Sequence, residues 1–318
     1  MSRIAFIKNN LEYLPEVEVY KNYFLNKGCD VSVVEHPSDR LNADVYWFFM
    51  GVEYRKKVPG IHIHEYASLA TPPFGLLKDR IKKIINIIPD GRIYLNETIK
   101  TKTLLDDVVP YIYRDMGVGD FFYKKDHLVK KEYDFVYIGS LSAKRNIRTL
   151  LSSFSTKHSQ YTLLIIGEYP DEIYHDFKGF SNIIFSGRVS YDEIPDLACK
   201  AKCGINYIPN IYPYKYQTST KLLEYLAMGL NVCSTRTQWV KSFSLKNNIE
   251  NIQFFNEDLN DFRPENYLST SKYWDGIENY TWNKIVEKAD LLGFIQSIIK
   301  NLSQKKLLER KSNRQFLR

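Results

Sequence analysis

The stretch TSTKLLEYLAMGLNVC, residues 218–233, is the most informative part of the sequence. Its apolar residues recur at helical spacing and predict a helix at about 219–228, and Gly229 predicts a turn into a strand at 231–233. Ser219 and Thr220 can cap this helix, whose first turn presents unpaired backbone N–H groups at the positive end of the helix dipole. A helix start of this kind can bind a phosphate.

Two charged residues follow on the same helix. Lys221 adds a mobile positive charge, and Glu224, one turn further, can accept two hydroxyl hydrogen bonds, as from a ribose diol. The segment therefore predicts a site for a phosphorylated ribose. The simpler interpretation, a capped helix with a surface glutamate, stays open because short motifs often match by chance.

Strand-like apolar runs alternate with helical patterns along most of the chain, which is typical of α/β folds with parallel sheets. In the second half, three such runs each end in a glycine, at Gly139, Gly167 and Gly187. The pattern breaks between residues 111 and 131, where we place a domain boundary. We expect two doubly wound, Rossmann-like domains with the carboxyl ends of their sheets on a common cleft, where ligands of open α/β sheets bind.

Composition excludes several classes of protein. The chain has 318 residues, of which 44% are hydrophobic and 25% charged, so disorder and coiled coils are not expected. No apolar run reaches the roughly 20 residues that cross a bilayer, and the first 30 residues contain four acidic ones, so we expect a cytoplasmic protein. The four cysteines lack the spacing of a disulfide framework or a zinc site and are interpreted as buried thiols.

The formal charge of +7 is concentrated at two places. Residues 76–88 interleave Lys78, Arg80, Lys82 and Lys83 with apolar side chains, which is typical of an amphipathic helix that can lie on an anionic membrane. Residues 303–318 hold six basic residues and one acidic one. The alternatives are a core helix with a charged outer face and a solvated tail. No basic stripe is interleaved with stacking aromatic residues, so nucleic acid is not an expected partner.

Several segments resemble, in order and spacing, the retaining nucleotide-sugar glycosyltransferases of the GT-B fold, family 4 (glycosyl transferases group 1). The resemblance covers roughly residues 112–300 and is carried by residues 116–118, 134–147, 163–167, 184–189, 193–197, 218–233 and 280–282. It implies an acceptor-binding domain at 1–122, joined by a C-terminal helix at about 282–318, and a nucleotide-sugar domain at 123–281.

The resemblance also implies the parts of a donor site. Glu224 would hold the ribose, Arg145 would take the place of the usual phosphate-binding lysine, and the backbone at Gly187, Arg188 and Val189 would meet the nucleobase. The phosphate loop would contain Gly139 and Ser140, and the diphosphate would lie against Ser219, Thr220 and Lys221. Arg145 and Lys221 would also be catalytic, because cations aimed at the leaving diphosphate stabilise the transition state.

Three positions depart from the family pattern. Ser140 stands where an arginine is common, Tyr216 stands where a glutamate usually touches the transferred sugar, and Lys8-Asn9-Asn10 replaces a glycine-rich turn. We retain Tyr216 as a donor-binding residue, since its ring can pack on a sugar.

The stretch GIHIHEYASL, residues 60–69, is the main polar cluster of the first half. As a strand it would place His62 and His64 on one face and Glu65 on the other. The resemblance implies a histidine near this sheet edge, so His64 is a candidate for contacting the reacting sugar, and His62, His64, Glu65 and Tyr66 are candidates for binding the acceptor. No third ligand with suitable spacing accompanies the two histidines, so no metal is expected. Histidines satisfied by neighbouring backbone are the alternative.

The resemblance implies transfer of a sugar, with retention of anomeric configuration, from a nucleotide-diphosphate sugar to a glycan or lipid-linked acceptor in surface polysaccharide biosynthesis. The departing phosphate would assist deprotonation of the acceptor, and no cofactor would be needed. The protein would be cytoplasmic, with a peripheral position on the inner face of the membrane as an option. The alternative function is a non-catalytic protein that binds sugar nucleotides or glycans on the same scaffold. An epimerase is disfavoured, because no acid and base pair is evident.

Overall fold

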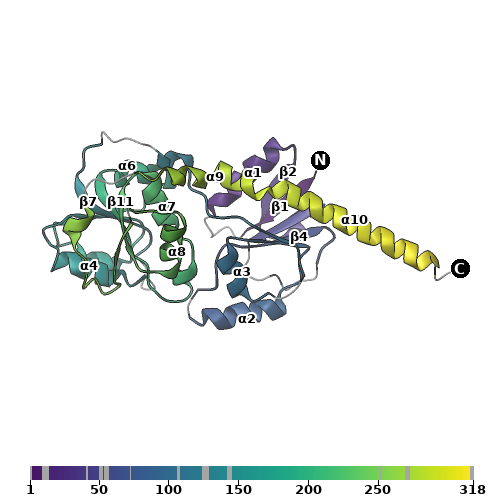
Figure 1. Cartoon of the computed structure of the whole chain (residues 1–318), viewed down its shortest axis with the longest axis horizontal. Coiled ribbons are helices and arrows are strands. Elements are labelled where there is room, and N and C mark those ends of the chain that lie inside the picture. Colours follow the sequence, from purple (N-terminus) through teal and green to yellow (C-terminus); the bar gives the residue numbers. More distant parts are fainter. Residues whose placement is uncertain are drawn as a thin grey trace. The chain divides into compact units, whose positions relative to one another are not determined.

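The structure is a computed structural model of the whole chain (Figure 1). It describes residues 2–8, 14–40, 42–49, 53, 57–71, 73–105, 108–123, 129–141, 145–250, 252–268 and 273–315, and in the last helix it describes side chains as far as residue 305 and at residue 308. The chain divides into two compact units: unit 1 comprises Met1–Asp115 and Trp282–Arg318, and unit 2 comprises Met116–Thr281.

Unit 1 is built on a six-stranded parallel sheet with strand order β2-β1-β3-β4-β5-β6. Its strands are β1 Arg3–Ile7, β2 Asp30–Val34, β3 Val45–Phe49, β4 Ile61–Tyr66, β5 Gly91–Tyr94 and β6 Tyr111–Tyr113. Its helices are α1 Pro15–Asn26, the 3-10 helix η1 Pro37–Arg40, α2 Gly75–Ile85, α3 Glu97–Thr103, α9 Trp282–Ala289 and α10 Leu291–Gln315.

Unit 2 has a second six-stranded parallel sheet, with order β12-β11-β10-β7-β8-β9. Its strands are β7 Tyr133–Ile138, β8 Leu163–Ile166, β9 Ile183–Gly187, β10 Ala201–Asn206, β11 Asn231–Thr235 and β12 Ile252–Phe255. Its α-helices are α4 Ile147–Ser155, α5 Asp171–Phe177, α6 Ile194–Ala198, α7 Thr220–Ala227 and α8 Gln238–Lys246. Its 3-10 helices include η2 Asp120–Tyr123, η4 Tyr191–Glu193, η5 Tyr214–Tyr216, η6 Pro264–Tyr267 and η7 Asp275–Tyr280.

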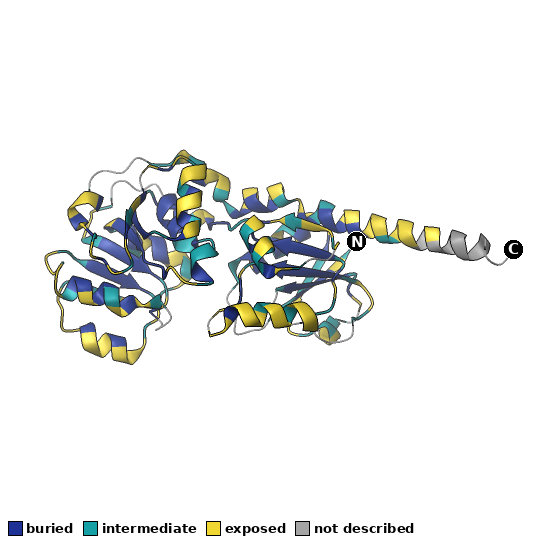
Figure 2. Cartoon of the chain, turned by 60° about the horizontal axis from the view of Figure 1, so that its bottom comes forward, coloured by how far each residue is buried: buried dark blue, intermediate teal, exposed yellow. Residues whose placement is uncertain are grey.

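The central strands of both sheets are buried, as in parallel sheets covered by helices, whereas the edge strands β2 and β6 of unit 1 are partly exposed. Dark, buried residues concentrate on the strands, and exposed residues lie on the outer sides of the helices (Figure 2). The two sheets with their helices confirm the expected two-domain α/β fold. All four cysteines are free and buried, as the sequence predicted.

The core of unit 1 encloses a charged cluster. The buried guanidinium of Arg114 donates to Glu65 and, at 3.3 Å, to Glu16. Glu65 also accepts hydrogen bonds from the Tyr20 hydroxyl at 3.1 Å and from the Trp47 indole nitrogen at 2.8 Å. The carboxylates thereby gain the counter-charge and hydrogen bonds that buried ions require.

The boundary expected after residue 122 lies earlier, at Asp115–Met116. Val118 donates its backbone N–H to Tyr280 and forms a β-bridge with Thr281, and Phe122 lies in the core of unit 2. These contacts assign the segment after Asp115 to unit 2. The C-terminal helix expected at about 282–318 is interrupted at Asp290, which has a left-handed φ of 46°, so α9 and α10 are separate helices.

Helix α7 is held on the sheet of unit 2 by Tyr225. The buried Tyr225 hydroxyl accepts a hydrogen bond from the Ile138 N–H at 2.9 Å and lies 3.2 Å from the Val136 carbonyl, to which it can donate. Its ring covers Gly204 of β10 so closely that a Cβ there would lie 2.4 Å from the ring. The helix therefore spans β7 and β10, and its first turn lies beyond the carboxyl ends of these strands.

We expect Tyr225→Phe to lower the free energy of unfolding by about 1–3 kcal/mol, because the Ile138 N–H would remain buried without its acceptor. Urea unfolding of both proteins measures the difference. Tyr174→Phe is the matched control, since the Tyr174 ring is exposed on α5. Equal stabilities of Tyr225→Phe and the parent chain would show that the hydroxyl does not hold α7.

Candidate active site

The start of α7 is fixed by a chain of buried hydrogen bonds. Ser219 is the N-cap residue, and its hydroxyl accepts from the Leu222 N–H at 3.4 Å and donates to the Asn206 side-chain oxygen at 2.7 Å. Asn206 in turn donates to Ser234 at 2.8 Å. Ser219 therefore ties α7 to the ends of β10 and β11, and its hydroxyl is already engaged. Thr220, the first helical residue, is half-buried.

Lys221 extends from this first turn over an aromatic ring. Its ammonium nitrogen lies 4.0 Å from the centroid of the Tyr137 ring and donates to the Tyr207 carbonyl at 3.3 Å. Burial lowers the pKa of Lys221 well below its usual value, and the positive charge of Arg145 lowers it further, against the opposing effect of Glu224. Among the described residues, the Tyr137 ring and the Tyr207 carbonyl contact the ammonium group directly, and the charge of Glu224 also favours it.

Arg145 is the second cation at this place. Its guanidinium carbon lies 4.8 Å from the centroid of the Tyr214 ring, a distance typical of a cation–π contact. Burial raises the pKa of Tyr137 to about 12, and the charge of Arg145 opposes that rise. The charge of Arg145 thus acts on both Lys221 and Tyr137, which indicates that the three side chains share one environment. Among the described residues, no carboxylate forms an ion pair with Arg145 or Lys221.

Glu224 lies one turn further along α7 and is only 4% exposed. The Tyr191 hydroxyl donates to its carboxylate at 2.6 Å. Burial raises the pKa of Glu224 to about 7, although the hydrogen bond from Tyr191 and the charge of Lys221 oppose the rise. The carboxylate is therefore close to the midpoint of its titration at neutral pH.

The structure brings Arg145, Lys221 and Glu224 together beyond the carboxyl ends of β7 and β10, the edge at which α/β sheets bind ligands. The other donor-site candidates lie at ends of neighbouring strands or in the loop before α7. Gly139 donates its N–H to the Ile166 carbonyl, and the Gly187 carbonyl accepts from the Gly167 N–H at 3.0 Å. These backbone groups therefore already form hydrogen bonds between the ends of neighbouring strands. Ser140 and Arg188 are exposed, and Val189 packs against the core.

Tyr216 is half-buried in the loop before α7. Its ring lies 6.3 Å from that of Tyr212, and the ammonium of Lys215 lies 5.0 Å from its centroid. The sequence reasoning missed Tyr191 as the partner of Glu224 and did not assign Tyr137 and Tyr214 to the cations. The sequence has tyrosines at positions 207, 212, 214 and 216, and this clustering is the signal that could have indicated an aromatic lining.

In unit 1, His62 and His64 share a face of β4 and both contact one carboxylate. Glu53 lies 3.1 Å from His62 Nδ1 and 2.5 Å from His64 Nε2. The other His62 nitrogen lies 3.1 Å from the Val58 carbonyl. Burial lowers the pKa of His64, against the effect of Glu53, and both rings are fully buried. The histidines are thus satisfied largely by protein groups.

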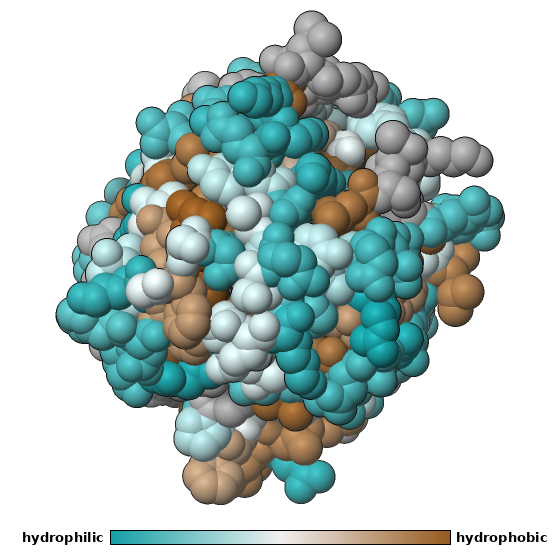
Figure 3. All heavy atoms as spheres, turned by 90° about the vertical axis from the view of Figure 1, so that its left-hand side faces the viewer, coloured by the Kyte–Doolittle hydropathy of each residue, from teal (hydrophilic) through white to brown (hydrophobic). Residues whose placement is uncertain are grey.

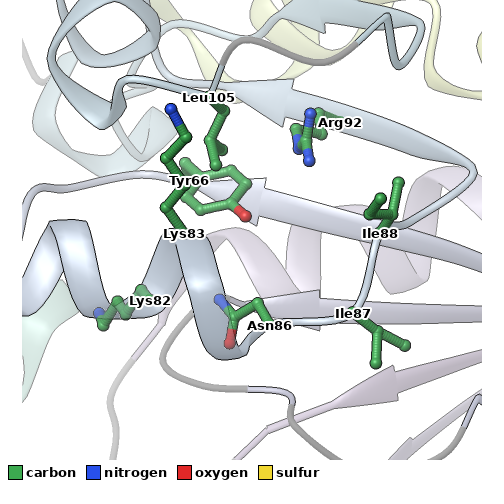
Figure 4. Close-up of a pocket in the computed structure, with 8 residues that line it drawn as sticks. All are labelled: Tyr66, Lys82, Lys83, Asn86, Ile87, Ile88, Arg92 and Leu105. Atoms are coloured by element: carbon green, nitrogen blue, oxygen red, sulfur yellow. The ribbon is translucent and has the colours of Figure 1, made fainter.

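Glu65 points to the opposite face, as strand alternation predicted, and belongs to the Arg114 cluster described above. The structure therefore does not bring Glu65 together with the two histidines. Tyr66 stacks on Tyr94, with ring centroids 5.3 Å apart, and lines a pocket of about 140 Å³ beside α2 (Figure 4). Within the described part of the chain, no group of three or more His, Cys, Asp or Glu side chains is placed to hold a metal ion.

Solved structures with the same fold are glycosyltransferases of the GT-B architecture. AviGT4, a glycosyltransferase involved in avilamycin A biosynthesis, is 13% identical with a TM-score of 0.62, and the match covers 94% of this chain and 99% of that one. HepE of Anabaena in complex with UDP is 11% identical with a TM-score of 0.63, covering 96% and 100%. Sucrose-phosphate synthase of Thermosynechococcus elongatus is 11% identical with a TM-score of 0.66, covering 96% and 100%.

A family model matches part of the sequence of unit 2. Residues 132–260 match the model of the family described as glycosyl transferases group 1, in agreement with that part of the resemblance found in the sequence. The match covers less than half of the chain. No curated protein matches the chain by sequence.

The titration of Glu224 makes stability depend on pH. Because its pKa rises from 4.5 to about 7 on folding, the folded protein keeps a proton that the unfolded chain has released between these values. Stability contributed by the protonated form is thus lost as the pH rises through this window, on the order of 3 kcal/mol. We expect Glu224→Gln to lack this loss.

Urea unfolding near pH 4.5 and again above pH 7 measures the effect as a difference between the variant and the parent chain. The exposed Glu250 provides the matched control, since Glu250→Gln should follow the parent at both values. A parent chain whose stability relative to Glu224→Gln stays constant across the window would contradict the assignment.

Proposed function

We propose that this protein transfers a sugar from a nucleotide-diphosphate sugar to a hydroxyl group of a glycan or lipid-linked acceptor, with retention of anomeric configuration. The observation that carries the proposal is the convergence of Arg145, Lys221 and Glu224 at one sheet edge of unit 2. Two cations that form no ion pair with a carboxylate among the described residues suit a diphosphate, and a buried carboxylate one helical turn away suits a ribose diol.

Donor binding would change the protonation of both buried groups. A diphosphate beside Lys221 would favour its ammonium form, which burial disfavours in the free protein. Ribose hydroxyls donating to Glu224 would favour its ionised form in the same way. UDP is the first donor nucleotide to test, because HepE, which has this fold, was solved with UDP and with UDP-glucose.

In the reaction that we propose, the bond between the anomeric carbon and the diphosphate oxygen breaks, and the acceptor oxygen forms a bond to that carbon on the same face. The negative charge that develops on the departing phosphate is stabilised by Arg145 and Lys221. The acceptor proton passes to an oxygen of this phosphate, so that no side chain need act as the base. These cations supply the positive charge that a metal ion gives in other transferases, and the proposal includes no cofactor.

In unit 1, we assign His62 and His64 a positioning role through Glu53, since all three are buried together. Tyr66, which lines the pocket beside α2, is the acceptor-binding candidate that a ligand can reach. The acceptor class and a role in surface polysaccharide biosynthesis remain part of the proposal. So does a peripheral membrane position. None of the described helices is both long and apolar enough to cross a membrane.

We expect Arg145→Ala to weaken UDP binding about tenfold or more, since a hydrogen bond to a charged group contributes about 1.5–3 kcal/mol. Isothermal titration calorimetry measures the dissociation constant. Arg148→Ala is the matched control, because Arg148 lies three residues further along the chain, in α4, and its ion pairs among the described residues are with the exposed Glu172 and Asp176. Equal dissociation constants of the parent chain and Arg145→Ala for UDP would show that Arg145 does not bind the diphosphate.

Turnover separates the enzyme from the alternative, a non-catalytic binding protein suggested by Tyr216 and Ser140. UDP-glucose incubated with the chain and an acceptor extract should release UDP, and Glu224→Ala should reduce that release at least tenfold through loss of the ribose contact. Proton NMR of the product gives the anomeric configuration, which we expect to be retained. Binding of several UDP-, GDP- and CDP-sugars without release of any diphosphate would favour the alternative.

A further inference from the structure

Helix α2 of unit 1 exposes an unusual amount of apolar surface. Its only buried residue is Gly75, and exposure reaches 82% for Ile84 and 75% for Phe74 just before the helix. The other large apolar side chains exposed along this segment are Leu76, Leu77, Ile81, Ile85 and Ile88. Figure 2 shows α2 coloured as exposed along most of its length, and brown apolar spheres reach the lower edge of Figure 3, where α2 lies in Figure 1.

The exposed residues form a stripe and not a random scatter. Leu77, Ile81 and Ile84 follow one another at spacings of four and three, which places them on one side of an α-helix. Asp79, the one acidic residue of α2, accepts from the Ala70 N–H at 3.2 Å and so faces the body of unit 1. The apolar side of the helix therefore faces outward, and its one acidic residue, Asp79, faces the body of unit 1.

Basic residues flank this stripe. Lys78, Arg80, Lys82 and Lys83 lie within the same 11 residues. A contiguous apolar stripe between cations matches the surface of an anionic bilayer, where apolar side chains enter the acyl boundary and lysines and arginines meet the headgroups. A second copy of the chain would place these like charges against one another, so a bilayer is the occupant favoured by charge.

The pocket beside α2 extends this surface. It is lined by Tyr66 of β4, Arg92 of β5, and Lys82, Lys83 and Asn86 at the end of α2 (Figure 4). Arg92 is only 4% exposed, and its charge contributes to lowering the pKa of His64. Lys83, Arg92 and the Tyr66 phenol provide donors that a phosphate group accepts from in this pocket of about 140 Å³, whereas the Lys82 side chain extends away from them (Figure 4).

We propose that α2 docks on an anionic lipid bilayer and that the adjacent pocket receives the phosphate of a lipid headgroup. If the protein transfers a sugar as proposed above, the acceptor is a lipid whose sugar or hydroxyl group is linked through phosphate. This identification of the acceptor rests on the proposed function. The apolar stripe sets the depth of docking, Lys83 and Arg92 contact the phosphate of the one headgroup that enters the pocket, and Arg80 meets the anionic surface outside it.

The test is flotation of the full chain with vesicles of phosphatidylcholine mixed with phosphatidylglycerol, and with vesicles of phosphatidylcholine alone. The parent chain should bind the mixed vesicles more tightly, and Ile84→Ser should bind them about tenfold more weakly, since each buried CH₂ contributes about 0.8 kcal/mol. Leu245→Ser is the matched control, because Leu245 is 78% exposed on α8. Absence of binding, or equal binding by Ile84→Ser and the parent, overturns the proposal.

Two cations of α2 separate the pocket from general surface charge. Arg80→Gln removes an exposed cation outside the pocket, and Lys83→Gln removes one of the pocket's own. We expect about fivefold weaker binding for Arg80→Gln, from about 1 kcal/mol per cation, and a larger loss for Lys83→Gln. Equal losses overturn the headgroup site.

The remaining readouts separate this inference from its alternatives. An apparent mass that doubles with concentration for the parent but not for Ile84→Ser would assign the stripe to a second copy and overturn bilayer docking. UDP affinity of Ile84→Ser, measured in the absence of vesicles, should equal that of the parent. Failure of vesicle binding with intact UDP binding thus refutes the docking surface and leaves the proposed transfer reaction standing.

Discussion

The geometry of unit 2 depends on how helix α7 is fixed to the sheet. Tyr225 bonds to β7 and covers Gly204 of β10, while Ser219 reaches β10 and β11 through Asn206 and Ser234. These anchors act at both ends of the first two turns. Lys221 and Glu224 lie between them, so their positions follow from buried hydrogen bonds and close packing, which tolerate little displacement.

The two units hold their cations in different ways: Arg114 is buried, whereas Arg145 and Lys221 are partly exposed. In unit 1, Arg114 is neutralised by Glu65 and Glu16, which makes the cluster part of the core. In unit 2, Arg145 and Lys221 rest on the rings of Tyr214 and Tyr137, which attract a cation without cancelling its charge. A tyrosine support of this kind holds the side chains in place without neutralising them. In the transfer reaction that we propose, such preorganised charge is effective because the protein need not reorganise during the reaction.

The sequence predicted those features that follow from local pattern. Alternating strand and helix signals indicated two parallel-sheet units, and the motif at 218–233 placed Lys221 and Glu224 on one helix start. Features that depend on distant partners were not accessible in this way. Tyr191 donates a hydrogen bond to Glu224, Glu53 contacts both histidines, and Arg114 donates to Glu65. In each case the two partners are far apart in the sequence and meet only in the folded protein. The early boundary at Asp115 has the same origin, because it depends on Val118 pairing with Thr281.

Unit 1 is assembled from two distant pieces of chain, since α9 packs against α1 only after all of unit 2 has intervened. Unit 2 is a single uninterrupted segment. During synthesis from the N-terminus, its core can therefore close on the ribosome while unit 1 still lacks the helices that cover α1. The connectivity thus sets the order in which the two units mature: unit 2 is complete before unit 1.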